Sequence, residues 1–219
     1  MNAGTWRMIA MLAAAAVLAL PTHSQRRPSV HPTVFTSTDG TFQFSHPSEF
    51  QVCTAGKMEP CIIQSYIPPC EEDAIVCVVY PARQFEGTSF GAAAFQVREI
   101  HTEREAMTPD VCVTPYTKRS GAGGVSPWPE FLISAQHPEE IIGGVLFVHG
   151  ITGEAAMSHS SSVDLYRAFH RQNCYELSLS ESGTNPDVTD PPMKTLTDAA
   201  QRDVDESLSQ ILHSFRFLN

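Results

Sequence analysis

Three histidines in the second half of the chain are the residues whose type could bind a metal. Imidazole is a common ligand of zinc and copper, and His149, His159 and His170 follow one another at intervals of ten and eleven residues. Metal ligands on one element are usually only a few residues apart, so this spacing does not by itself bring them together. We expect ordinary hydrogen-bonded histidines and no cofactor, and keep the three as candidate ligands in a metal-dependent alternative.

A second arrangement has the residue types of a hydrolase. Ser160 could act as a nucleophile with His159 as its base, and the strand-like run ending in His149-Gly150-Ile151-Thr152-Gly153 is similar to the oxyanion loop of α/β-hydrolases. That chemistry also needs a G-x-S-x-G elbow, an acid and a final histidine downstream. The segment Met157–Ser161 lacks both glycines. We therefore expect no catalytic residue and keep a small secreted enzyme as the alternative.

An apolar segment near the start of the chain predicts export. Arg7 precedes a run from Met8 to Leu20, which Pro21 ends. One cation, an apolar run and then small polar residues are typical of a secretory signal peptide, and the run is shorter than the ~20 residues that cross a membrane. We expect a signal peptide over 1–24, a secreted or periplasmic protein, and no stable membrane insertion after cleavage. A signal kept as an anchor is the alternative.

Six cysteines follow this segment, and their spacing favours disulfides over metal or redox chemistry. Disulfides form in oxidising compartments, and there is no C-x-x-C pair of the kind found in thioredoxin-like, c-type haem and zinc-knuckle motifs. We expect local closure among the first four cysteines and a long bridge from Cys112 to Cys174. The set is Cys53, Cys61, Cys70, Cys77, Cys112 and Cys174.

Charge and composition exclude two classes of partner. The 219 residues include 14 Lys and Arg against 24 Asp and Glu, a formal net charge of -10, without a basic cluster. Contacts to nucleic-acid phosphates or to anionic lipid surfaces need such clusters. The 42% of hydrophobic residues is typical of a globular protein. The expected partner is an unknown protein or small ligand, and not a nucleic acid.

Alternating patterns place most of these residues on β-strands. Phe42 and Phe44 alternate with polar residues after the turn signal Asp39-Gly40, which predicts a hairpin. Segments 164–170 and 174–180 flank a short turn and predict a second hairpin. Further strands are expected over 50–53, 62–67, 74–80, 90–100 and 141–148, the last interrupted by a Gly-Gly pair, with 182–192 as a loop.

A helical period near the end of the chain completes the expected fold. Apolar residues recur every three or four positions, Thr195 or Thr197 can cap the start, and Asp198 suits its positive end. Strands followed by one long helix predict an α+β fold, with a curved antiparallel sheet covered by a long C-terminal amphipathic helix. The apolar set is Leu196, Ala200, Val204, Leu208, Ile211, Leu212 and Phe215.

The expected domain organisation is one domain over 34–219, preceded by a disordered leader over 25–33. A Gly/Pro-rich segment at about 108–129 is expected to be a long loop. Trp128 lies between two prolines in that loop, and a rigid exposed aromatic is a common contact at interfaces. Trp128 is therefore the interface candidate.

Two segments together resemble PsbP-like proteins. Asp39–Phe50 is similar to the hairpin that opens those proteins, and Ile211–Phe217 is similar to the helix end that closes them. The resemblance spans about 34–218 and implies an αβα sandwich used for docking to other proteins, with no shared catalytic residues. No site residue is carried over from it. The Gly/Pro-rich loop and the six cysteines depart from the plant-type members, which argues against a photosystem role. The expected function is binding without catalysis, to a partner that the sequence does not identify.

Overall fold

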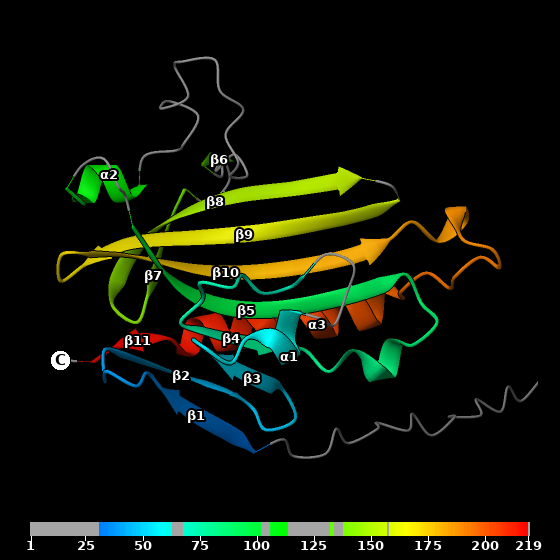
Figure 1. Cartoon of the computed structure of the whole chain (residues 1–219), viewed down its shortest axis with the longest axis horizontal. Coiled ribbons are helices and arrows are strands. Elements are labelled where there is room, and N and C mark those ends of the chain that lie inside the picture. The colour runs from blue at the N-terminus through cyan, green and yellow to red at the C-terminus, as the bar shows by residue number, and fades with distance from the viewer. Residues whose placement is uncertain are drawn as a thin grey trace, which may run out of the picture. The chain divides into compact units, whose positions relative to one another are not determined.

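Among the described residues, eight strands form one antiparallel sheet, in the order β3-β4-β5-β10-β9-β8-β6 with β7 also paired to β8 (Figure 1). The computed structural model describes residues 31–62, 68–101, 106–113, 132–133, 138–156 and 158–218. The expected signal peptide, Trp128 and most of the Gly/Pro-rich segment lie outside these ranges. The strands are β3 (Gln51–Thr54), β4 (Val76–Val79), β5 (Phe90–Ile100), β6 (Leu132–Ile133), β7 (Glu139–Ile142), β8 (Val145–Ala156), β9 (His159–His170) and β10 (Asn173–Thr184).

A small three-stranded sheet joins the two ends of the described chain. It consists of β1 (Pro32–Thr36), β2 (Phe42–Pro47) and β11 (Arg216–Phe217), in the order β1-β2-β11. Phe42 on β2 pairs with Phe217 on β11. β1 begins at Pro32, so the last two residues of the leader expected over 25–33 belong to a strand, and the backbone pairs with β2 from Pro32 on.

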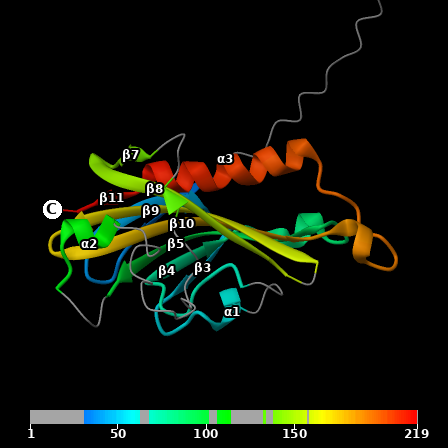
Figure 2. The same ribbon diagram turned by 90° about the horizontal axis from the view of Figure 1, so that it is seen from above.

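The helix α3 (Asp198–Ser214) covers one face of the large sheet, as Figure 2 shows. Thr197 caps it by accepting a hydrogen bond from the Ala200 N–H at 3.2 Å. Its buried side chains pack with phenylalanines of β2 and with apolar residues of β5 and β10 in a common core. The predicted α+β fold, with a C-terminal amphipathic helix on an antiparallel sheet, is confirmed. The buried residues of α3 are Val204, Leu208, Ile211 and Leu212.

All six cysteines are described, and they form the three disulfides Cys53–Cys61, Cys70–Cys77 and Cys112–Cys174. The predicted local closure and the predicted long bridge are both confirmed. The long bridge joins α2 (Pro109–Val113) to β10 on the sheet face opposite α3, since Cys174 alternates with Tyr175 of the core face. The short helix α1 (Glu59–Ile62) is held to β3 in the same way by Cys53–Cys61.

Several predicted boundaries are wrong. Ile62 ends α1 and does not start a strand, and 63–67 lie outside the described residues. The expected loop at about 108–129 contains α2. The strand expected over 141–148 is two strands, because Gly143 and Gly144 have φ of 56° and 83° and form the turn between β7 and β8. The expected 182–192 loop starts later, since β10 continues to Thr184 and is followed by the 3-10 turn η3 (Pro186–Val188).

Candidate functional site

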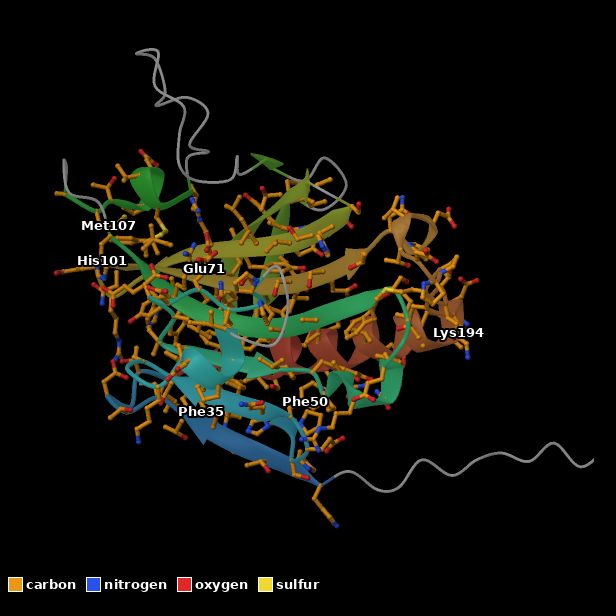
Figure 3. All side chains as sticks on the ribbon, turned by 45° about the vertical axis from the view of Figure 1, so that its right-hand side comes forward. Phe35, Phe50, Glu71, His101, Met107 and Lys194 are labelled. Carbon is orange, nitrogen blue, oxygen red and sulfur yellow. A yellow bond between two sulfur atoms is a disulfide. The ribbon has the colours of Figure 1, made fainter. Side chains whose placement is uncertain are left out.

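A cavity of about 840 Å³ lies where the ends of β9 and β10 meet the start of α3. Ser160 and Ser162 come from β9, Glu181 and Gly183 from β10, and Gln201 from α3. Lys194, labelled in Figure 3, lies at this end of the molecule, just before α3, and the Ser89 N–H donates to its carbonyl oxygen at 2.7 Å.

The hollow exists because the strands change composition along one face. On β10, alternate residues point toward α3, and the series begins with Tyr175 and Leu177 in the core but ends with Glu181 and Gly183. The residues facing them on β9 change likewise, since Tyr166 pairs with Leu177 but Ser162 pairs with Glu181. Small side chains cannot fill the space beneath the first turns of α3, which leaves the cavity open.

Glu181 is the carboxyl group of the cavity. The Gln201 Nε2 donates to Glu181 Oε2 at 2.5 Å and to Asp205 Oδ1 at 2.9 Å. Burial raises the pKa of Glu181 to about 7, with further upward contributions from a hydrogen bond to Asp205 and from the charges of Asp205 and Asp164. Near neutral pH this carboxyl group is therefore protonated in about half of the molecules.

The opposite wall of the cavity is apolar. Phe90 of β5 lines it, and its ring packs edge-on against Phe85 at a centroid distance of 5.0 Å. Leu196 lies beside it, with its N–H donating to Ser89 Oγ at 3.3 Å. None of the described lining residues is Lys or Arg. The cavity thus combines an apolar wall, serine hydroxyls and one half-buried carboxyl group.

Ser160 and His159, the hydrolase pair predicted as an alternative, both line the cavity. The two are neighbours on β9, and neighbouring strand residues point to opposite sheet faces. The His159 Nδ1 lies 3.0 Å from Thr184 Oγ1, within hydrogen-bond distance. Ser158 lies in the turn before β9, and Ser160 belongs to the first part of that strand. His149-Gly150 lies inside the continuous strand β8, with no strand-to-helix turn.

The three histidines expected as alternative metal ligands lie far apart. His159 and His170 are the two ends of the twelve-residue strand β9, a separation of about 36 Å at 3.3 Å per residue. His149 Nε2 pairs with Asp164 Oδ1 at 2.8 Å, while the His170 ring stacks on Phe217 at 4.0 Å. Within the described ranges no group of three His, Cys, Asp or Glu side chains could hold a metal ion.

A buried ionic cluster lies on the sheet face opposite α3. Glu176 Oε1 accepts from Arg98 Nη2 at 2.5 Å, and Glu176 Oε2 accepts from Arg167 Nε at 2.7 Å. Only 1% of Glu176 is exposed, and the register places it between the two arginines on neighbouring strands. This cluster ties β5, β10 and β9 together across their centre.

Sequence reasoning missed both Glu181 and this cluster. The available signal was a charged residue inside an apolar strand: Glu176 interrupts the Cys174–Leu179 run, and Glu181 continues the alternation of Tyr175 and Leu177 toward the core. Which partners these charges meet depends on strand register, and no local pattern contains that information.

Comparisons with known proteins show a likeness of fold. No protein-family model and no curated protein matches the chain. Among solved structures, LpqN of Mycobacterium tuberculosis, described as involved in cell envelope biogenesis, is similar over 88% of this chain and 93% of its own, at 9% identity and a TM-score of 0.42. The Ran-binding protein Mog1p of Saccharomyces cerevisiae is similar over 86% and 96%, at 12% identity and a TM-score of 0.44.

The third structure is PsbP of the cyanobacterium Synechocystis sp. PCC 6803. It is similar over 94% of this chain and 99% of its own, at 10% identity and a TM-score of 0.40. A PsbP protein, of the class that the sequence resembles, is thus among the solved structures similar to this chain. No helix among the described residues is both long and apolar enough to cross a membrane. Function is argued below from the residues of this chain.

Proposed function

We propose that this chain is a secreted or periplasmic binding protein, and that the cavity at the start of α3 takes up a small polar ligand. The observation that carries the proposal is the cavity itself, whose volume of about 840 Å³ falls within the ~300–1,000 Å³ range of small-molecule sites. Its hydroxyl groups and the carboxyl of Glu181 supply the few polar contacts that orient a ligand, and Phe90 and Leu196 supply an apolar wall.

Binding without turnover is the activity that the side chains support best. Ser160 and His159 occupy successive positions on β9, where side chains alternate between the two sheet faces, and His159 Nδ1 lies 3.0 Å from Thr184 Oγ1. Both observations argue against a catalytic pair of Ser160 and His159. The separation of His159 from His170 along β9 argues in the same way against a site built on the three histidines.

An oxidising compartment is supported by the three disulfides, since such bonds persist mainly outside the cytosol. We infer that residues 1–24 are an export signal and that the domain begins after a short leader. Trp128 stays a predicted contact for a protein partner. N-terminal sequencing of the protein recovered from its producing cells tests the export signal, and a mature chain that still begins at Met1 would contradict it.

The binding proposal is tested by filling the cavity. A Ser162→Phe variant places a ring in the hollow, whereas Ser48→Phe places one on an exposed turn before β3. In a thermal-shift screen of small metabolites, a ligand of the cavity stabilises the wild type and Ser48→Phe but not Ser162→Phe. Hits that stabilise all three proteins equally, or a screen without hits, would contradict the proposal. If mass spectrometry shows that the protein converts a hit to another compound, the protein is an enzyme instead.

A further inference from the structure

The walls of the cavity select the charge of its ligand, and this inference rests on the proposed function. The charges of two carboxyl side chains act on Glu181: Asp205 from α3, and Asp164 from β9, whose Oδ1 also lies 2.8 Å from His149 Nε2. Its neighbour on β5 is the uncharged Ala93. His159 also lines the cavity, but Glu181 is the one Asp, Glu, Lys or Arg side chain among the described lining residues. Its carboxylate, with Asp205 beside it, attracts a cation and repels an anion.

The start of α3 does not reverse this preference. A helix N-terminus attracts anions through its unpaired N–H groups. Here the Ala200 N–H donates to the Thr197 side chain and the Leu196 N–H donates to Ser89 Oγ. Asp198 adds a negative charge in the first turn. The Thr197 cap therefore occupies one N–H of the first turn, and the Asp198 carboxylate opposes the binding of an anion there.

One nitrogen already occupies the position that a cationic group would take. The side-chain nitrogen of Gln201 contacts carboxyl oxygens of both Glu181 and Asp205, at 2.5 and 2.9 Å. We propose that the cavity binds a small organic amine whose ammonium group replaces the Gln201 amide between Glu181 and Asp205. The carbon chain of the amine then lies along Phe90 and Leu196, where apolar area is available.

Binding of an amine is coupled to release of a proton. Below pH 7 the Glu181 carboxyl is mostly protonated, because its pKa is raised to about 7. The ammonium group favours the carboxylate, so the proton leaves Glu181 for the solvent and the amine keeps its own three protons. The apparent affinity therefore increases about tenfold for each unit by which the pH rises toward 7, and it is constant above pH 7.

A matched pair of probes tests the charge preference. 6-Amino-1-hexanol and 1,6-hexanediol have the same length, and differ by an ammonium group in place of one hydroxyl. In NMR titrations of the full chain at pH 8, we expect the amine to shift the resonances of cavity residues with a dissociation constant of about 1 mM or lower, and the diol to bind at least tenfold more weakly. Equal binding of the two probes, or no binding of the amine, would overturn the proposal.

Calorimetry of the same amine tests the proton release. Titrations in two buffers of different ionisation enthalpy count the protons released, and we expect close to one at pH 6 and close to none at pH 8.5. Glu181→Gln should weaken amine binding at pH 8 at least tenfold and remove the proton release. Glu72→Gln, which changes an exposed carboxylate near β4, should change neither. Amine binding without proton release, or unchanged binding by Glu181→Gln, would overturn the proposal.

The outcomes separate this inference from the proposed function. If neutral metabolites bind wild type and are excluded by Ser162→Phe while amines do not bind, the cavity is a ligand site and the preference for amines is wrong. If neither class binds, both proposals fail.

Discussion

Glu181 makes the stability of the protein depend on pH in the direction opposite to that of most carboxyl groups. Its pKa in the folded chain is about 7, above the ordinary value of 4.5, so the folded state holds this proton more tightly than the unfolded state does. Its contribution to stability is therefore complete below about pH 4.5 and declines as the pH rises to about 7.

A Glu181→Gln variant, which cannot ionise, should be more stable than the wild type at pH 8. We expect a gain of about 1–2 kcal/mol, less than the full pKa difference implies because water reaches part of the side chain. Urea unfolding at pH 4.5 and pH 8 measures this gain. The free energies of unfolding of the two proteins should become equal at the lower pH. With Glu72→Gln as a control, parallel pH profiles for wild type and Glu181→Gln would contradict the prediction.

Glu176 is a second single residue on which the stability of the fold depends. Replacing it by Gln leaves the two buried guanidinium groups of Arg98 and Arg167 without the carboxylate that both contact. We expect a loss of about 3–5 kcal/mol in the free energy of unfolding, because Glu176 is the buried counter-charge that both arginines contact, and removing one partner of a buried ion pair is costly. Urea denaturation measures the loss. Glu206→Gln, on the exposed side of α3, should change stability by less than about 0.5 kcal/mol, and equal losses in the two variants would show that the cluster contributes little.

Among the elements, the turn between β7 and β8 has the strictest steric requirement. A Cβ at Gly143 would overlap the carbonyl oxygen of Phe215 and lie 2.8 Å from the Arg216 Cα, while a Cβ at Gly144 would meet nothing within 4 Å. The turn therefore packs directly against the end of α3.

Gly143→Ala should cost clearly more stability than Gly144→Ala. Both positions have positive φ, which costs a non-glycine residue about 1–2 kcal/mol. At Gly143 the new Cβ also overlaps the end of α3, so Gly143→Ala should lower the free energy of unfolding by about 2–4 kcal/mol in total. Urea unfolding of the two variants, each compared with the wild type, tests the difference. Equal effects would mean that the end of α3 moves aside without cost.

The elements that could be predicted from the sequence are those whose apolar residues recur with a clear helical or strand periodicity. The α3 pattern and the alternation around Tyr175 and Leu177 both place apolar residues on one buried face, so position and face follow directly. The parts missed are the ends of β8, β9 and β10. These ends are rich in Ser and Gly, which are typical of turns, yet Ser160, Ser162 and Gly183 are the residues that make the cavity hollow. The Ser- and Gly-rich composition that forms the cavity is therefore also the reason why the sequence did not predict these strand ends.

For the whole molecule, the disulfides contribute by restricting the unfolded chain. Cys112–Cys174 closes a loop with a sequence separation of 62, and Cys53–Cys61 one with a separation of 8. Loop entropy predicts contributions of about 4 and about 2.5 kcal/mol. Replacing each pair by alanines and measuring unfolding in urea should give the larger loss for the longer loop. The reverse order would mean that strain or residual structure outweighs loop length.

The pairing of β2 with β11 also bears on how the chain folds. Phe42 and Phe217 are neighbours in the small sheet although nearly the whole domain separates them in sequence, and Phe215 packs on Phe42 at a centroid distance of 5.3 Å. Contacts between such distant residues must form by closing very long loops, which slows folding. β2 pairs with β1, which precedes it, but its second partner, β11, is synthesised after every other described strand. The small sheet is therefore complete only after β11 has been synthesised.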